Sequence, residues 1–159
     1  MKNQIRSIRC QWNRISLYFA LLLIVAAFSG CTSVKLIADY DEAIEIGITS
    51  FHKKMETHLT KLERNLGKEE AKYENHIDFY DQVKIDLSAI RVRAAALPKN
   101  EITLQQLDLM IDNVKMLEEL HKLGISKNDI PPLRSAFNTG TTAILKLELA
   151  KKRGEKTKE

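Results

Sequence analysis

The stretch from 36 to 66 carries apolar side chains at intervals of three or four residues, a spacing that an α-helix brings onto one face. The pattern repeats after eleven residues and comprises Ile37, Tyr40, Ile44, Ile48, Phe51, Met55, Leu59, Leu62 and Leu66. An eleven-residue repeat matches about three turns of a nearly straight helix. Gly67 follows directly, where glycine commonly ends a helix. The sequence therefore predicts a long helix over 36–66 with one continuous apolar face.

Two further stretches, 69–97 and 103–123, show the same helical spacing. Pro98 is expected to end the first of them, because the residue before a proline avoids helical backbone angles. Thr103 and Gln106 form the pattern of a capping box, which predicts the start of the second. Gly124 is expected to end it in a left-handed conformation.

A fourth helical stretch covers 129–153. Prolines 131 and 132 are tolerated in a first turn and so indicate its start, while Gly154 is expected to stop it. Its last turn is basic, which suits the negative end of the helix dipole and would also suit anionic lipid headgroups; the residues are Lys151, Lys152 and Arg153. With short connections and no stretch of period two, the chain is predicted to be all-α. The expected architecture is an antiparallel up-down four-helix bundle with helices at about 36–66, 69–97, 103–123 and 129–153.

Two glycines lie inside predicted helices, Gly47 in the first and Gly140 in the fourth. Glycine in a helix interior costs about 1 kcal/mol relative to alanine. In an up-down bundle these two helices are antiparallel neighbours, and the glycines would lie nearly level. We hypothesise that they let the two backbones approach closely; the alternative is two unrelated, tolerated glycines.

The N-terminus has the organisation of a targeting segment. Residues 1–14 contain four basic side chains and no acidic one, and the next fourteen residues, 15–28, contain no charge. Small residues then precede Cys31. This order is typical of a secretory signal peptide, and the apolar run is shorter than the roughly twenty residues that a membrane-spanning helix needs.

The residues Phe28-Ser29-Gly30-Cys31 resemble the lipobox of bacterial lipoproteins, with Phe28 where leucine is usual. The resemblance implies cleavage after Gly30, a diacylglycerol group on the thiol of Cys31 and acylation of the new amine. Two or more acyl chains anchor a protein stably in a membrane. The expected organisation is a signal peptide at 1–30, a lipidated tether at 31–35, a helical bundle at 36–154 and a frayed tail at 155–159. In a Gram-negative host, Thr32 in the place of a retention-signal aspartate implies the outer membrane, facing the periplasm.

Cleavage would also change the charge of the chain. The whole sequence carries a formal charge of +4, but residues 1–30 hold four of the 25 basic residues and none of the 21 acidic ones. The remainder is therefore formally neutral and retains one cysteine, Cys31. A nucleic-acid partner is not expected, since such a partner calls for a clustered positive surface.

No catalytic, cofactor or metal site is predicted. Glu118 precedes His121 by three residues, which gives one Glu-x-x-His motif, whereas a ferritin-like metal site needs this motif on two helices. The other three histidines, at 52, 58 and 76, have Thr49, Met55 and Tyr73 at that position. His76 and His121 fall on apolar stripes and are expected in the core or at its boundary.

We therefore expect a non-enzymatic module, anchored through Cys31, that binds or scaffolds another envelope protein or self-associates. The chain also resembles small all-helical envelope lipoproteins of bacteria, a likeness that assigns no activity. The alternative is a small-ligand or enzymatic pocket inside the bundle that uses Glu118 and His121. We further hypothesise that the tip between the first two helices, with Leu62, Leu66 and Tyr73, is a partner surface; otherwise these side chains are covered by the neighbouring helix.

Overall fold

The computed structural model describes residues 37–156, and the predicted signal peptide, the lipobox and Cys31 lie outside them. The described part contains four α-helices and no strand, which confirms the all-α prediction. They are α2 (Glu42–Asn65), α3 (Ile77–Ala95), α4 (Glu101–Leu123) and α5 (Ile130–Lys156). Two short 3-10 helices, η1 (Glu69–Ala71) and η2 (Tyr73–His76), lie between α2 and α3. None of the helices in residues 37–156 has the length and apolar content needed to cross a bilayer.

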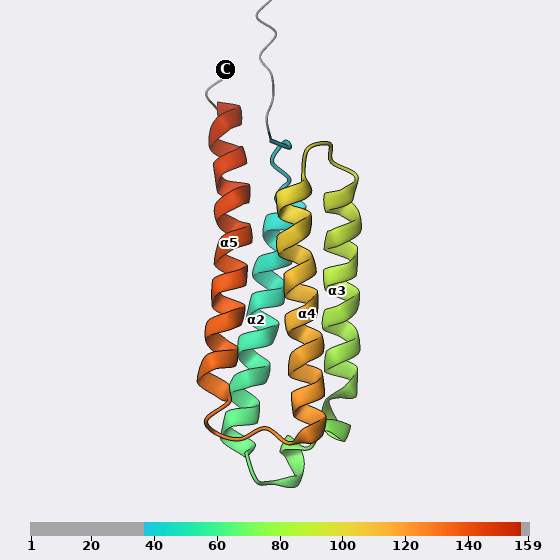
Figure 1. The fold of residues 1–159 in the computed structure, drawn as a ribbon, viewed down its shortest axis with the longest axis vertical. Helices are drawn as coiled ribbons and strands as arrows, with labels where there is room; N and C mark the ends of the chain where they lie inside the picture. The colour runs from blue at the N-terminus through green and yellow to red at the C-terminus, as the bar shows by residue number, and fades with distance from the viewer. Residues whose placement is uncertain (1–36, 157–159) are drawn as a thin grey trace, which may run out of the picture. The chain divides into compact units, whose positions relative to one another are not determined.

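The four helices run up and down, each antiparallel to the next (Figure 1). Each packs against its neighbours in sequence, and α5 packs against α2 to close the ring in the order α2, α3, α4, α5. Apolar side chains from all four helices fill the centre, and the large, fully buried ones include Phe51, Tyr80, Leu87, Leu107, Met110 and Phe137. The predicted four-helix bundle is therefore the observed fold.

The first helix begins at Glu42, six residues later than predicted. Asp41 adopts an extended backbone, and its carboxylate accepts hydrogen bonds from the backbone N–H groups of Ala43 (2.8 Å) and Ile44 (3.3 Å). An aspartate in this position caps a helix and satisfies donors that have no partner within it. Before the cap, the Ala38 N–H donates to the Lys99 carbonyl at 3.0 Å, which ties the chain to the α3–α4 connection instead of a helical turn.

The prediction that the second helix starts at 69 was wrong, because α3 starts at Ile77. Side chains donate hydrogen bonds to backbone carbonyls that would accept from backbone N–H groups in a continuous α-helix: Asn75 donates to the carbonyl of Glu69, and His121 donates to that of Ala71. Side-chain hydrogen bonds of this kind compete with helix formation. The segment folds into η1 and η2, which pack on the end of the bundle.

At the tip, Leu62 is buried, and Leu66 and Tyr73 are half-buried and packed against the core. The tip as a partner surface stays a prediction. The predicted ranges also made the first two helices the longer pair, which was wrong, because α2 has 24 residues and α3 has 19, against 23 in α4 and 27 in α5.

The predicted capping box at Thr103 was also wrong. The third helix starts at Glu101, with Asn100 in the cap position, and Thr103 lies buried one turn inside. Gly124 has a positive φ of 106°, as expected for a helix-ending glycine, but its ψ of 120° lies outside the left-handed helical region. The fourth helix starts at Ile130, which confirms the reading of the two prolines, and it continues past Gly154 to Lys156.

The two helix-interior glycines do not face each other. A Cβ added to Gly47 would lie 2.9 Å from two side-chain atoms of Ile90 on α3, and one added to Gly140 would lie 2.7 Å from Cε of Met110 on α4. Each glycine makes room for one large core side chain of a neighbouring helix. The hypothesis of a close α2–α5 approach at these residues is therefore wrong, and the two glycines serve separate contacts.

Candidate functional site

The outer flank of α4 carries a stripe of exposed apolar side chains. Large apolar residues recur every seven positions along the helix, and we call them the α4 stripe: Ile102, Leu109, Met116 and Leu123. Their exposed fraction rises along the helix from 54% at Ile102 to 87% at Leu123. A seven-residue interval keeps side chains along one line of a helix. The stripe runs the whole length of α4, and its members are distinct from the buried residues of that helix.

Two members of the stripe, Ile102 and Met116, lie beside α5. Met116 lines a hollow of about 230 Å³ between the two helices, together with Leu133 and Ala136 of α5. At the other end, Ile102 lines a smaller hollow with Leu147 and Ala150 of α5. We call these two apolar hollows, together with the α4 stripe, the α4–α5 groove; Ala136 and Ala150 are the small residues on its α5 side.

Contiguous exposed apolar surface is uncommon on soluble domains and usually marks an interaction site. The outer face of α3 also exposes apolar residues, but they are fewer: Ile85 and Val92 are 62% and 67% exposed. Ile85 and Val92 therefore serve as control positions for the α4 stripe, since they have the same seven-residue spacing but do not lie beside the groove.

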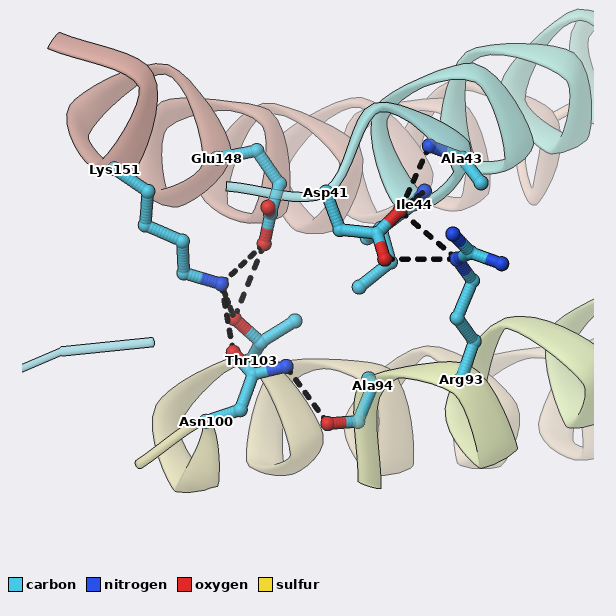
Figure 2. A network of polar contacts seen from close by, with 9 residues as sticks. All are labelled: Asp41, Ala43, Ile44, Arg93, Ala94, Asn100, Thr103, Glu148 and Lys151. Atoms are coloured by element: carbon cyan, nitrogen blue, oxygen red, sulfur yellow. Dashed lines mark hydrogen bonds and ion pairs between the residues drawn. The ribbon is translucent and has the colours of Figure 1, made fainter. Parts of the chain in front are cut away.

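The end of the bundle near the α3–α4 connection holds a buried polar network (Figure 2). Nζ of Lys151 donates to Glu148 Oε1 (2.5 Å), Asn100 Oδ1 (2.6 Å) and Thr103 Oγ1 (2.9 Å). The Asn100 side-chain amide donates to the Ala94 carbonyl at 2.9 Å. Lys151 is 5% exposed, so it does not take the role expected for a basic C-terminal turn at the surface. The network joins α5 to the α3–α4 turn.

Glu148 is 0% exposed, and its Oε2 has no hydrogen-bond partner in the structure. A buried carboxylate is tolerated when a cation pairs with it, and losing that cation is costly. Beside this network, Arg93 Nε donates to both carboxylate oxygens of Asp41, at 2.9 and 2.8 Å, and so holds the cap of α2 against α3. Both sets of contacts involve helix ends, and we assign them a structural role.

A cluster of aromatic rings and histidines lies at the opposite end of the bundle. Tyr80 OH is 2.7 Å from Nδ1 of His121, and the other ring nitrogen of His121 is 2.7 Å from the Ala71 carbonyl. A carbonyl can only accept, so His121 carries its proton on Nε2 and accepts from the Tyr80 hydroxyl at Nδ1. His58 completes the cluster, with Nε2 at 3.4 Å from Tyr80 OH.

Burial governs protonation in this cluster. It lowers the pKa of His58 from 6.5 to about 3, helped by the nearby His76, His121 and Lys61. Burial also lowers the pKa of His121, against the opposing effect of its hydrogen bond to Ala71. Both imidazoles are therefore neutral at neutral pH, which matches their arrangement as hydrogen-bonded core groups.

His121 is buried and His76 half-buried, which confirms the prediction for both. Glu118 and His121 have different hydrogen-bond partners: Glu118 accepts from Tyr73 OH (3.0 Å) and from Lys84, whereas His121 bonds to Tyr80 and Ala71. Within residues 37–156, no group of three or more His, Cys, Asp or Glu side chains has a geometry that could hold a metal ion.

Sequence reasoning overlooked both the α4 stripe and His58. The stripe was visible as a second seven-residue series beside the core series of the same helix. His58 had no such signal, because its environment is made by residues of three other segments.

The chain matches no protein-family model, no curated protein and no solved structure. The class of the protein is thus defined by its own fold and surface: an all-α four-helix bundle with an apolar groove along the α4–α5 seam.

Proposed function

We propose that this protein is a lipid-anchored module of the cell envelope that binds a helical segment of another envelope protein along the α4–α5 groove. The observation that carries the proposal is the α4 stripe, four large apolar side chains in one line on an exposed helix flank. Partner proteins dock amphipathic helices in apolar grooves and anchor them through side chains at helical spacing.

The small residues on the α5 side support this mode of binding. Ala136 and Ala150 leave room beside the stripe, so a third helix could lie in the groove at a normal interhelical distance of about 8–10 Å. Met116 suits such a surface, because a thioether side chain adapts its shape to a partner.

The lipobox-like residues support the location. Acyl chains on Cys31 would hold the bundle at the membrane, and within residues 37–156 the backbone hydrogen bond of Ala38 to Lys99 ties the chain to the bundle seven residues after Cys31. Seven residues of fully extended chain span at most about 25 Å. The proposed partner is therefore a protein that presents a helix close to the membrane surface.

In-cell photocross-linking of the full-length lipoprotein tests this proposal. A photoreactive benzoylphenylalanine is introduced at Leu109 or at Met116, and cross-linked products are identified by mass spectrometry. The matched control places the same group at Ile85 or Val92, which are as exposed but lie on α3. We expect a discrete heteromeric product from the α4 positions and none from the α3 positions.

Two further arms make the result decisive. Met116→Lys with the photoreactive group at Leu109, or Leu109→Lys with the group at Met116, should abolish the product without loss of fold, because substitutions at exposed positions usually change stability by less than about 0.5 kcal/mol. Cys31→Ala should reduce the product by releasing the bundle from the membrane. Equal products from α3 and α4 positions would contradict the assignment of the groove, and a product that contains this chain alone would replace the partner by a second copy.

A further inference from the structure

A second hollow lies on the other side of the bundle, between α2 and the beginning of α3. Its volume is about 530 Å³, within the range of about 300–1,000 Å³ that is usual for small-molecule sites. Its lining residues come from α2, η2 and α3, and they are Ser50, Lys53, Lys54, Thr57, His58, Lys61, Asn75, His76 and Phe79. We call this hollow the α2–α3 pocket.

The charged residues that line the α2–α3 pocket are all basic. Three of its lining residues are lysines and none is an aspartate or glutamate. Lys54 pairs with Asp86 of α3 at 2.5 Å. Lys53 and Lys61 have no ion pair within residues 37–156, which leaves two uncompensated positive charges above one hollow. Concave sites lined by one sign of charge attract ligands of the opposite sign.

The inner wall of the pocket is aromatic. The rings of His58 and Phe79 are stacked, with centroids 3.7 Å apart and planes inclined by 11°. The His76 ring stands edge-on to His58, with centroids 5.0 Å apart. Nε2 of His76 is 2.9 Å from the Glu70 carbonyl, so this ring is held in place by η1. A preformed aromatic wall offers a surface for a planar or apolar group.

Core residues hold the aromatic wall in place. His58 is 4% exposed, and its Nε2 contacts the hydroxyl of Tyr80, which is hydrogen-bonded to His121. The lysines, by contrast, lie on the solvent-facing side of α2. The pocket therefore combines a buried aromatic wall with a cationic rim, and a few charged groups beside an apolar wall are usual in small-molecule sites.

We infer that the α2–α3 pocket binds a small organic anion, with its carboxylate or phosphate held by Lys53 and Lys61 and its apolar ring placed against Phe79. This site is independent of the proposed partner groove, because it uses other helices. It also differs from the predicted interior pocket, since neither Glu118 nor His121 lines it.

Fluorescence anisotropy of 1-naphthyl phosphate with the full-length protein in detergent tests the inference. We expect saturable binding, with affinity at least about tenfold lower for the double variant Lys53→Gln, Lys61→Gln. The matched control, Lys127→Gln with Lys146→Gln, removes the same charge from residues that do not line the pocket and should bind as the unmodified protein does. Both pairs are exposed, and circular dichroism verifies that the variants are folded.

Three further measurements separate the contribution of the lysines from that of the aromatic wall and identify the source of the anion. Uncharged 1-naphthol should bind at least about tenfold more weakly than 1-naphthyl phosphate if the lysines hold the anion. Phe79→Leu should weaken binding of the naphthyl compound and leave competition by inorganic phosphate unchanged. Competition by dihexanoyl phosphatidylglycerol, compared with inorganic phosphate, distinguishes a lipid headgroup from a free anion as the source of the charge.

Two results would overturn the inference. If the control pair lowers affinity as much as the pocket pair, the attraction belongs to the overall charge. If 1-naphthol binds as tightly as its phosphate, the pocket recognises an apolar ring and not an anion.

Discussion

Acidification from about pH 7 to about pH 5 should destabilise the bundle chiefly through His58. The folded protein lowers the pKa of this buried imidazole from 6.5 to about 3. Between these two values the unfolded chain binds a proton that the folded chain does not. Stability from His58 is therefore complete above about pH 6.5 and is lost progressively as the pH falls toward 3.

The size of the effect follows from the same two values. At pH 5 the unfolded imidazole is almost fully protonated and the folded one almost fully neutral, which costs about 2 kcal/mol of unfolding free energy relative to pH 7. His121, whose pKa burial also lowers, adds a loss of the same sign. The carboxyl groups whose pKa the fold lowers contribute little in this interval. The Arg91 ion pair lowers the pKa of Asp108, and hydrogen bonds from Ser126 lower that of Asp129, so their stabilisation is lost only below about pH 4.

Urea unfolding followed by circular dichroism, at a series of pH values, measures this loss in the unmodified protein and in His58→Phe. Phenylalanine keeps a ring against Phe79 and leaves the 2.7 Å bond between Tyr80 and His121 in place. We expect the variant to lose about 2 kcal/mol less than the unmodified protein between pH 7 and pH 5. His52→Gln, a change on the same helix outside the ring cluster, serves as the control and should retain the full loss. Equal losses in the unmodified protein and His58→Phe would show that His58 is protonated in the fold, and the reasoning from burial would be refuted.

Three further predictions concern stability and are checked by chemical denaturation. Lys151→Ala leaves the buried Glu148 carboxylate without its cation and should cost about 3–5 kcal/mol, whereas Lys151→Met with Glu148→Leu should recover most of the loss; a double variant no better than the single one would contradict this account. Gly140→Ala should stabilise the protein by up to about 1 kcal/mol, because the terminal methyl of Met110 can move aside. Gly47→Ala should gain less or destabilise, since its Cβ meets both Cγ1 and Cδ1 of Ile90, and equal gains at the two positions would count against this steric reading. Asp41→Ala removes the cap of α2 and should cost about 1 kcal/mol, while Asp41→Asn, which keeps a capping oxygen, should cost less; an equal cost would point to the Arg93 ion pair as the main contribution.

The number and order of the helices could be predicted because each apolar stripe is a local property of the sequence. Burial of a stripe of helical period requires a helix wherever the spacing occurs, and Ile44, Phe51 and Leu59 are buried as that argument demands. Prolines 131 and 132 also act locally, through their fixed backbone angles, and the start of α5 was correctly predicted from them.

The helix ends could not be predicted, because distant residues decide them. Arg93 lies 52 residues from Asp41, and His121 lies 50 residues from Ala71, yet these pairs contribute to where α2 and α3 begin. Thr103 shows the same limit. Its sequence neighbourhood favours a cap, but Lys151, 48 residues away, requires its hydroxyl inside the bundle. The α2–α3 pocket has the same origin, since its lysines and its aromatic wall come from different elements.

The ring order of the helices separates the two proposed surfaces. Since α2 contacts α3 and α5, and α4 contacts the same two helices, the α2–α3 seam and the α4–α5 seam lie on opposite sides of the bundle. A helix docked along the α4 stripe would therefore leave the α2–α3 pocket open. It follows that Leu109→Lys with Met116→Lys should leave binding of 1-naphthyl phosphate unchanged, and that Lys53→Gln with Lys61→Gln should leave the cross-linked product unchanged. Loss of both activities in either variant would mean that one surface has been assigned two roles.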